Sequence, residues 1–490
     1  MTVSVPHLPR PKAWPELALQ AAVTTTDFAL RFGIRPEFFV DKLAQRVGAA
    51  LKETETDPET LAHLLWFGSH LQPFLHRLVR ERPAAARAIL RFMGTYAWDV
   101  YRRTEEQREG LPSPSTVVIE PTDRCNLRCP GCYANSRASG SDLPFEQLVA
   151  IVEQVIDMGV SLITLSGGEP FLRERADRAI TRLAARFPER GFLVYTNGTL
   201  IDEATSRRLG EVGNVFLAIS VEGYESQTDA RRGAGIYERN RHVRRLLAEQ
   251  GVMTGFSATV TRENAELIAS DEFIDRRIAE GDLFGWFFLL QPIGRSPRPD
   301  LMPTARQRAL LREAVIRWRE SDRPIFLGDF WNDGPLVGGC IAGGRYYFHI
   351  YANGDISPCV FAPVSCGNIF EILAGKTPYT NLRDFVERHP VFAAIRQEQK
   401  RIRDRRSPCL LIDHPDVGRR ICLMEGCRPA KNMPPGYLDG AIARMIDESA
   451  AQWCDTAPRL RPIAAAETST RYKFHPADAP GNGSSALPLQ

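Results

Sequence analysis

Between residues 116 and 320 the chain alternates short apolar runs with amphipathic segments, and this alternation restricts the fold more than any other feature. The apolar runs read as strands at residues 116–120, 161–166, 191–195, 214–220, 252–261 and 284–291. Segments between them have the apolar spacing of helices, for example residues 144–158, 204–212 and 237–250. Strands that alternate with helices pair in parallel through right-handed crossovers. The sequence therefore predicts an α/β fold with six strand–helix units.

Three cysteines directly follow the first predicted strand. Cys125, Cys129 and Cys132 form a C-x3-C-x2-C array in a turn-rich segment, residues 120–135. Because four-iron clusters normally take four cysteine ligands, a loop with three thiolates leaves one iron open to a substrate or cofactor. The alternatives are unrelated buried thiols and a zinc knuckle. A zinc knuckle is disfavoured because no fourth Cys or His follows within the loop.

This cysteine loop resembles that of the radical S-adenosylmethionine (radical SAM) superfamily. The resemblance implies a 4Fe-4S cluster on the three cysteines, with S-adenosyl-L-methionine bound at the open iron and split to give a 5′-deoxyadenosyl radical. It also implies a partial (β/α)6 barrel, in which the loops after the strands hold the chemistry. The chain departs from the family at Gly131, where an aromatic residue is usual, and Tyr133 follows the last cysteine instead.

Loops after the later strands supply the residues that the resemblance assigns to the cofactor. SGGEP, residues 166–170, combines two glycines that allow close backbone approach with a carboxylate that meets the methionine amino group in the family. TNG, residues 196–198, and SVEG, residues 220–223, follow the third and fourth strands, and QPIG, residues 291–294, closes the sixth. The predicted cofactor-binding residues are Gly167, Gly168, Glu169, Asn197, Ser220, Glu222, Arg231 and Arg232.

Two roles among these residues stay open. Ser220 and Glu222 are expected near the ribose, and one of the two arginines is expected at the cofactor carboxylate, which suits a guanidinium fork. The alternative for Arg231 and Arg232 is an exposed position on a loop. Catalytic residues are not identified from the sequence.

A third region begins near residue 325 and contains most of the remaining cysteines. Cys340 precedes a predicted hairpin whose turn is Asn353 and Gly354, and Cys359 ends the return strand. This G-x4-C hairpin resembles the SPASM or twitch extension of radical SAM enzymes, which binds an auxiliary 4Fe-4S cluster.

The ligands of that auxiliary cluster are predicted less completely. Cys340, Cys359 and Cys409 are the expected ligands, and the fourth is Cys366, Cys427 or Cys422. The later cysteines do not follow the C-x2-C-x5-C-x3-C order of the full SPASM pattern, so we expect one auxiliary cluster. Cys454 lies in a helical context and is expected to be a core thiol.

These features divide the chain into four predicted parts. Residues 1–108 form a helical domain, residues 109–324 the barrel, residues 325–463 the cluster-binding extension, and residues 464–490 a disordered tail. In the first part, Leu71, Phe74, Leu75 and Leu78 have helical spacing and predict a packed core. Its aromatic residues leave a substrate entrance or peripheral membrane contact open.

Composition narrows the class of protein. With 490 residues, 43% hydrophobic and 25% charged, the chain reads as a soluble protein of several domains. A net charge of +3 gives no argument for a nucleic-acid partner, and no apolar run predicts a transmembrane segment or an export signal. The ten cysteines are therefore expected to ligate clusters in a reducing cytoplasm.

The resemblance predicts an enzyme that reductively cleaves S-adenosyl-L-methionine and abstracts hydrogen from an unactivated C–H bond. The expected result is an oxidative modification, or C–C or C–S bond formation, on a peptide, lipid or other small-molecule substrate. The expected electron donor is a flavodoxin or ferredoxin. The alternative is a non-enzymatic iron–sulfur electron carrier or sensor, which would not need the GGEP and SVEG loops.

Overall fold

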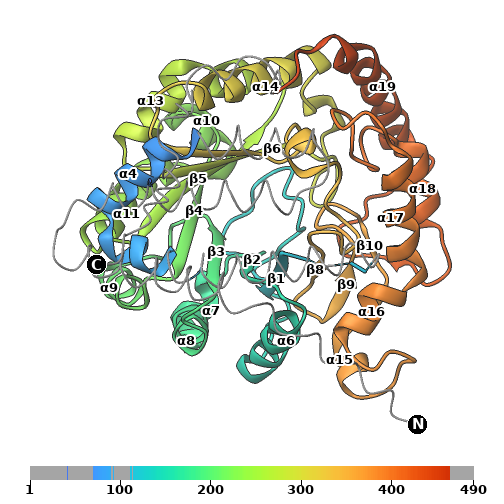
Figure 1. Ribbon diagram of the computed structural model, residues 1–490, viewed down its shortest axis with the longest axis horizontal. Helices are drawn as coiled ribbons and strands as arrows, with labels where there is room; N and C mark the ends of the chain where they lie inside the picture. The colour runs from blue at the N-terminus through green and yellow to red at the C-terminus, as the bar shows by residue number, and fades with distance from the viewer. Residues whose placement is uncertain (1–40, 42–69, 90–91, 93–110, 113, 464–490) are drawn as a thin grey trace, which may run out of the picture.

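The computed structural model describes residues 41, 70–89, 92, 111–112 and 114–463 (Figure 1). Most of the predicted helical domain and the predicted tail, residues 464–490, lie outside the described residues. The predicted barrel and extension are described almost completely.

A parallel sheet forms the centre of the molecule (Figure 1). Its strands pair in chain order, which confirms the parallel α/β fold and the six predicted strands. A further parallel strand pairs with the sixth and begins just after residue 324, the predicted domain boundary. The strands are β1 (Thr116–Thr122), β2 (Leu162–Gly167), β3 (Gly191–Thr196), β4 (Val215–Val221), β5 (Met253–Val260), β6 (Phe284–Leu289) and β7 (Phe326–Asp329).

Helices connect these strands and cover the outer face of the sheet (Figure 1). They are α6 (Phe145–Asp157), α7 (Phe171–Asp177), α8 (Ala179–Arg186), α9 (Glu203–Val212), α10 (Glu225–Arg232), α11 (Ile236–Glu249), α12 (Ala265–Ile268), α13 (Asp271–Ala279) and α14 (Ala305–Arg319). Alternate strand residues such as Val117 and Ile119 pack outward against α6 in one core cluster. Because side chains alternate along a strand, Val118 and Glu120 point to the inner face.

The extension continues the central sheet at the edge beside β1. β8 (His349–Ile350) pairs in parallel with β1 and antiparallel with β9 (Asp355–Ser357), which pairs with β11 (Gly367–Asn368). Gly354 has φ +84° in the predicted hairpin turn, which favours glycine. A separate two-stranded sheet contains β10 (Val364–Ser365) and β12 (Arg428–Pro429).

The helices of the extension lie together beside this sheet edge (Figure 1). They are α15 (Ile369–Leu373), α16 (Leu382–Arg388), α17 (Pro390–Arg401), α18 (Pro415–Cys422) and α19 (Ala441–Thr456). Short 3-10 turns are η1 (Pro299–Leu301), η2 (Gly334–Val337) and η3 (Ala457–Arg459). Val386 and Phe392 of this group share one buried core with strands β1 to β4. The extension and the barrel are therefore packed as one body.

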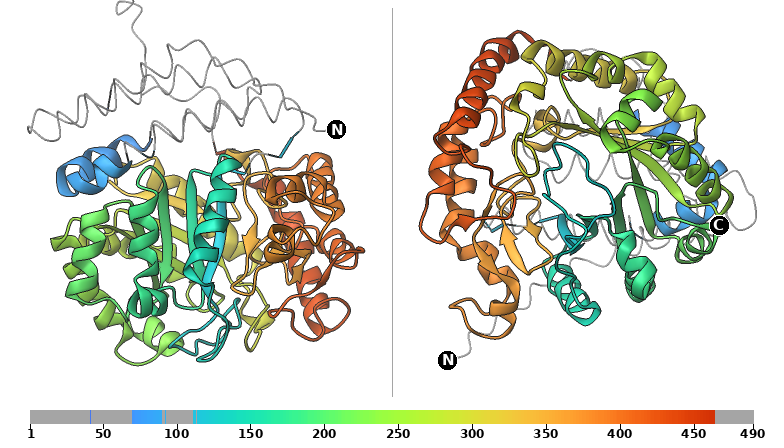
Figure 2. Two further views of the ribbon diagram at one scale, coloured as in Figure 1. Left: turned by 90° about the horizontal axis from the view of Figure 1, so that it is seen from below. Right: turned by 180° about the vertical axis from the view of Figure 1, so that it is seen from behind.

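Helix α4 (Gln72–Glu81) packs across the N-terminal halves of the strands (Figure 2). Phe74 and Leu78 are buried against Phe216 and Phe284, so the predicted apolar stripe is a core contact. Arg77 donates hydrogen bonds to the carbonyls at positions 278 and 282. Among the described residues, no helix has the length and apolar character that crossing a membrane requires.

Candidate active site

The cysteine loop leaves the C-terminal end of β1, where loops of parallel sheets meet. Its backbone is pinned at both ends of the array. The amide of Cys125 donates to the Arg137 carbonyl at 2.6 Å, and the Asn135 amide donates to the Cys132 carbonyl at 3.1 Å. All three thiols are partly exposed and on one loop, as a shared cluster requires.

The Gly-Gly turn after β2 lies against this loop. A Cβ atom at Gly168 would be 1.9 Å from the Arg124 carbonyl oxygen, so only glycine fits there. Gly167 has φ +98°, and a Cβ atom there would be 2.6 Å from Cγ of Glu120. The Glu169 amide donates to the Arg124 carbonyl at 2.8 Å. The two glycines therefore allow the turn after β2 to pack closely against the backbone of the cysteine loop.

The QPIG loop after β6 braces the other end of the array. The Arg295 amide donates to the Cys132 carbonyl at 2.9 Å, and the Gly131 amide donates back to the Arg295 carbonyl at 3.1 Å. Gly131 has φ +65°, which explains why glycine replaces the usual aromatic residue. Tyr133 is partly buried instead, with its hydroxyl 2.8 Å from the Ser166 hydroxyl.

Glu169 joins the loops that follow β2 and β3. Its carboxylate accepts from the Thr196 hydroxyl at 2.7 Å, the Asn197 amide at 2.7 Å and the Phe171 amide at 3.1 Å. Burial raises the pKa of Glu169, and these three donors oppose that rise. The Asn197 side-chain amide donates to Oδ1 of Asn126 at 2.9 Å, so this network ends at the cysteine loop.

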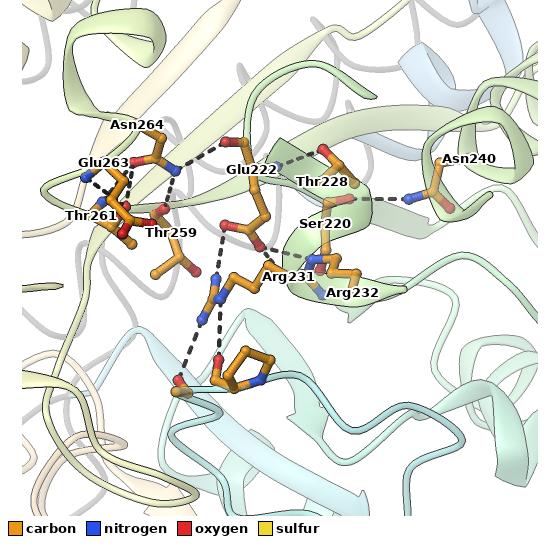
Figure 3. Close-up of polar contacts among 12 residues, drawn as sticks. Ser220, Glu222, Thr228, Arg231, Arg232, Asn240, Thr259, Thr261, Glu263 and Asn264 are labelled. Carbon is orange, nitrogen blue, oxygen red and sulfur yellow. Dashed lines mark hydrogen bonds and ion pairs between the residues drawn. The ribbon is translucent and has the colours of Figure 1, made fainter. Parts of the chain in front are cut away.

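The three charged residues predicted near the cofactor after β4 contact one another (Figure 3). The buried Glu222 carboxylate pairs with Arg231 at 2.8 Å and with Arg232 at 2.5 Å. Arg231 also donates to the carbonyls of Pro130 and Gly131, both at 3.3 Å. Neither arginine is a freely exposed loop charge. The cluster of charges connects α10 to the cysteine loop.

Ser220 lies near the end of β4, beside the charged cluster of Glu222, Arg231 and Arg232 (Figure 3). Its carbonyl accepts from the Asn240 side chain at 3.1 Å, which fixes the end of the strand. The Ser220 side chain is partly exposed.

The donor set of the cysteine loop fits an iron–sulfur cluster. Burial, with smaller contributions from Glu169, Cys132 and Cys129, raises the pKa of Cys125 to about 12, against the opposing effect of the Leu127 amide. Bound iron would reverse this, because a metal deprotonates the thiols that ligate it. Within the described part of the chain no three His, Cys, Asp or Glu side chains converge as a single ion needs. A cluster spreads its ligands over separate irons and does not need such convergence.

A charged group that the sequence did not single out lies beside the loop. Glu120 is fully buried, and its carboxylate contacts Lys431 Nζ at 2.6 Å and His349 Nε2 at 3.3 Å. Burial raises the pKa of Glu120, but Lys431 and His349 outweigh burial and lower it to about 2. The missed signal was an ionisable residue in an apolar strand, directly before the cysteine loop.

The extension gathers three of its expected ligands in one region. Burial raises the pKa of Cys409 well above its ordinary value, and the nearby Asp413, Cys340 and Cys359 raise it further. The Tyr347 hydroxyl is 2.7 Å from Cys359 Sγ. Cys340, Cys359 and Cys409 all contact the same hydrophobic core.

The remaining extension cysteines take three different positions. Cys422 is buried in the same core as Cys359. Burial, with smaller contributions from the nearby Cys427 and Cys359, raises the pKa of Cys422 to about 12. Cys366 lies in the other large core, and its Sγ is 3.7 Å from Cys427 Sγ. The prediction for Cys454 is wrong: it is exposed on α19, because the helix turns the neighbouring Trp453 inward.

Comparison with known proteins places the cysteine loop in a family. Residues 119–273 match the family model described as Radical SAM superfamily. The chain is 32% identical to Fe-coproporphyrin III synthase of Methanosarcina barkeri over 30% of this chain and 37% of that protein. It is 27% identical to PqqA peptide cyclase of Granulibacter bethesdensis over 52% of this chain and 70% of that protein.

The alignment with Fe-coproporphyrin III synthase covers less than half of that protein's own length. Among solved structures, Streptococcus suis SuiB bound to precursor peptide SuiA matches with a TM-score of 0.48 and 19% identity. That match covers 60% of this chain and 70% of SuiB.

The family match includes the cysteine loop, the Gly-Gly turn and the charged cluster of Glu222, Arg231 and Arg232. Residues 119–273 therefore form a radical SAM domain. Its relatives include SPASM-type and twitch-type members of that superfamily. The superfamily uses a 4Fe-4S cluster with S-adenosyl-L-methionine, and relatives of the SPASM type carry auxiliary clusters.

Proposed function

We propose that this chain is an enzyme that uses its radical SAM domain to abstract hydrogen from an unactivated C–H bond. A 4Fe-4S cluster on Cys125, Cys129 and Cys132, once reduced, would supply the chemistry by cleaving S-adenosyl-L-methionine to a 5′-deoxyadenosyl radical. The observation that supports this most is the three-cysteine loop braced from β2, β3, β4 and β6 at one end of the sheet. Such bracing suits a loop that must keep its position during reaction.

The residues around the loop divide into contact and bracing roles. Gly167, Gly168 and Glu169, with Asn197 and Ser220, are the proposed cofactor contacts, since they line the strand ends beside the thiols. Glu222, Arg231 and Arg232 are proposed to brace the loop, because their charges are used on one another and on loop carbonyls.

The extension is proposed to hold one auxiliary 4Fe-4S cluster. Its ligands would be Cys340, Cys359 and Cys409, with Cys422 as the fourth. These four contact one hydrophobic core, and the thiol of Cys427, which also packs against that core, lies 3.7 Å from Cys366. A buried auxiliary cluster favours an oxidative modification or C–C or C–S bond formation, since it can accept an electron. Electrons would reach the chain from a flavodoxin or ferredoxin in the cytoplasm.

A peptide is the substrate class we favour, with tetrapyrroles, lipids and other small molecules as alternatives. The PqqA peptide cyclase aligns with 52% of this chain at 27% identity, and the AdoMet-dependent heme synthase of Methanosarcina barkeri aligns with 67% at 24% identity. The higher identity supports the peptide, and the longer alignment makes a tetrapyrrole the first alternative.

The test is anaerobic reconstitution with iron and sulfide, then addition of dithionite and S-adenosyl-L-methionine. We expect 5′-deoxyadenosine and methionine from the wild type. Cys125→Ala should form neither, because the loop then offers only two thiolates. If the wild type forms no deoxyadenosine with a full iron complement and with peptide extract present, the chain is an electron carrier or sensor.

The auxiliary cluster has its own readout. Cys359→Ser and Cys422→Ser should each lower the iron content by about four atoms per chain. Deoxyadenosine formation from S-adenosyl-L-methionine alone should continue. Unchanged iron in both variants contradicts the auxiliary site while leaving the first cluster intact.

A further inference from the structure

Cys366 and Cys427 are a cross-strand pair. In the antiparallel ladder of β10 and β12, Val364 pairs with Pro429 and Ser365 with Arg428, so the register continues to Cys366 opposite Cys427. Directly opposite residues of such ladders have Cα atoms about 4.5–5.5 Å apart, within the range that a disulfide spans. The two sulfur atoms are already 3.7 Å apart.

The two thiols differ in access. Cys366 is 6% exposed and packs into the core that faces β1 and β2. Cys427 is only partly buried, at the start of the segment that becomes β12. The Cys427 thiol can therefore react with a small molecule from solvent, whereas the Cys366 thiol is shielded beneath it. Reversible thiol pairs use this combination of an accessible attacking sulfur and a buried resolving sulfur.

Their surroundings do not suit a metal ion. Cys366 lies in a different hydrophobic core from Cys340, Cys359 and Cys422, and Cys427 packs where the two cores meet. Across the described residues, no His, Cys, Asp or Glu completes a three-ligand ion site with the pair. The Cys427 thiol donates to the Ile421 carbonyl at 3.4 Å, so the second contact of this sulfur is a backbone oxygen.

We propose that Cys366 and Cys427 form a reversible dithiol–disulfide pair and are not cluster ligands. The oxidant is a low-molecular-weight disulfide such as oxidised glutathione. The Cys427 thiolate attacks one sulfur of that disulfide and releases one glutathione thiol. Cys366 then displaces the second glutathione, forming the Cys366–Cys427 bond. Two protein thiols are oxidised, one external disulfide is reduced, and both protons end on the released thiols.

The position of the pair gives this bond a consequence for the active site. β12 continues into the segment whose Lys431 contacts Glu120 and whose Asn432 carbonyl accepts from the Gly294 amide at 2.8 Å. A disulfide would fasten the start of this segment to β10 covalently. The redox state of the thiol pair therefore affects the segment after β12, which contacts Glu120 and the QPIG loop.

The test uses the full chain, reconstituted anaerobically with iron and sulfide. The protein is incubated with oxidised glutathione, blocked with iodoacetamide and analysed by peptide mass spectrometry. We expect a linked peptide pair containing Cys366 and Cys427, two hydrogens lighter than the sum of the free peptides and separated by dithiothreitol. The exposed Cys454 is the internal control, since it should form a mixed disulfide with glutathione. Recovery of both thiols in alkylated form, with Cys454 oxidised, overturns the proposal.

Two variants separate the pair from a metal site. Cys366→Ser should trap Cys427 as its mixed disulfide with glutathione, because the resolving thiol is gone. Cys366→Ser and Cys427→Ser should both keep the wild-type iron content. A loss of about four iron atoms per chain in either variant would identify cluster ligands and refute the proposal. Neither measurement depends on cleavage of S-adenosyl-L-methionine, so failure here leaves the proposed function standing.

Discussion

Glu120 shows how one residue connects the barrel to the extension. It is fully buried at the end of β1, and its partners His349 and Lys431 both come from the extension. A buried carboxylate without such partners would be strongly unfavourable. The contact therefore makes the position of the extension part of the stability of the strand that leads into the cysteine loop.

Lys431→Met should destabilise the protein at pH 7 by about 2–3 kcal/mol, because it leaves the buried Glu120 carboxylate with His349 alone. The folded pKa of Glu120, about 2, lies below its ordinary value of 4.5. The ion pair therefore stabilises the fold above the ordinary value and loses that contribution as pH falls toward 2. Urea unfolding of both proteins from pH 7 to pH 4 should show the difference shrinking on acidification.

Lys431→Arg is the matched control, since it keeps the positive charge. A penalty for Lys431→Met that does not change between pH 7 and pH 4 would show that lost packing, and not the charge of Glu120, causes it.

Gly168 is the second residue with a specific role, because the position has no room for a Cβ atom. Gly168→Ala should displace the cysteine loop, because its Cβ atom would lie 1.9 Å from the Arg124 carbonyl oxygen. We expect at least a tenfold loss of iron affinity in reconstitution. Gly235→Ala is the control, since its Cβ atom would meet no atom within 4 Å and its φ of +79° costs only about 1 kcal/mol. Equal iron affinity in both variants would contradict the seating of the turn on the loop.

At the scale of elements, α10 acts on the cysteine loop through its last turn. Arg231 and Arg232 end this helix, and Glu222 at the end of β4 holds both. Burial lowers the pKa of Arg232, but Glu222 and Cys129 outweigh it and raise that pKa. The guanidinium is therefore charged and close to the thiols, where it can offset the negative charge of a thiolate-bound cluster.

Arg231→Met should make the reconstituted protein lose iron to a chelator about tenfold faster, because the carbonyls of Pro130 and Gly131 lose their donor. The measurement is the anaerobic rate of iron release, followed by the visible absorbance of the cluster. Arg241 makes an exposed ion pair on the next helix, so Arg241→Met is the control and should release iron at the wild-type rate. Equal rates for the two variants would remove the bracing role of Arg231.

At the scale of the whole molecule, the extension covers an edge of the sheet. β8 pairs with β1, and helices α16 and α17 complete the core that contains Val117 and Ile119. Without it, β1 would present unpaired backbone groups and an apolar surface to solvent, which favours aggregation. The barrel and extension are therefore expected to fold together.

A chain ending at residue 339 should be insoluble or elute as aggregates in size-exclusion chromatography. It lacks β8, the helices of the extension, and both partners of Glu120. A chain ending at residue 463 keeps every described contact and should elute like the full chain. A soluble, monomeric chain of 339 residues would show that the barrel folds independently.

The sequence alone determined the local chemistry. Apolar periodicity identified the six strands within two residues of their ends, because alternation of strands and helices is a local property. Three cysteines and a Gly-Gly turn identified the site, since thiols and unhindered glycines are requirements that no other residues meet. The same local reasoning failed at Cys454, whose exposure depends on which face α19 buries.

Only the tertiary structure decided which charges meet. Glu222, Arg231 and Arg232 looked alike as cofactor contacts, yet packing uses them on one another. Glu120 and Lys431 are 311 residues apart, and no pattern in the sequence links them. The cysteines of the extension likewise divide between two cores, with Cys427 packed against both. Pairings of this kind depend on how elements pack in space, whereas sequence periodicity reports only what each element buries.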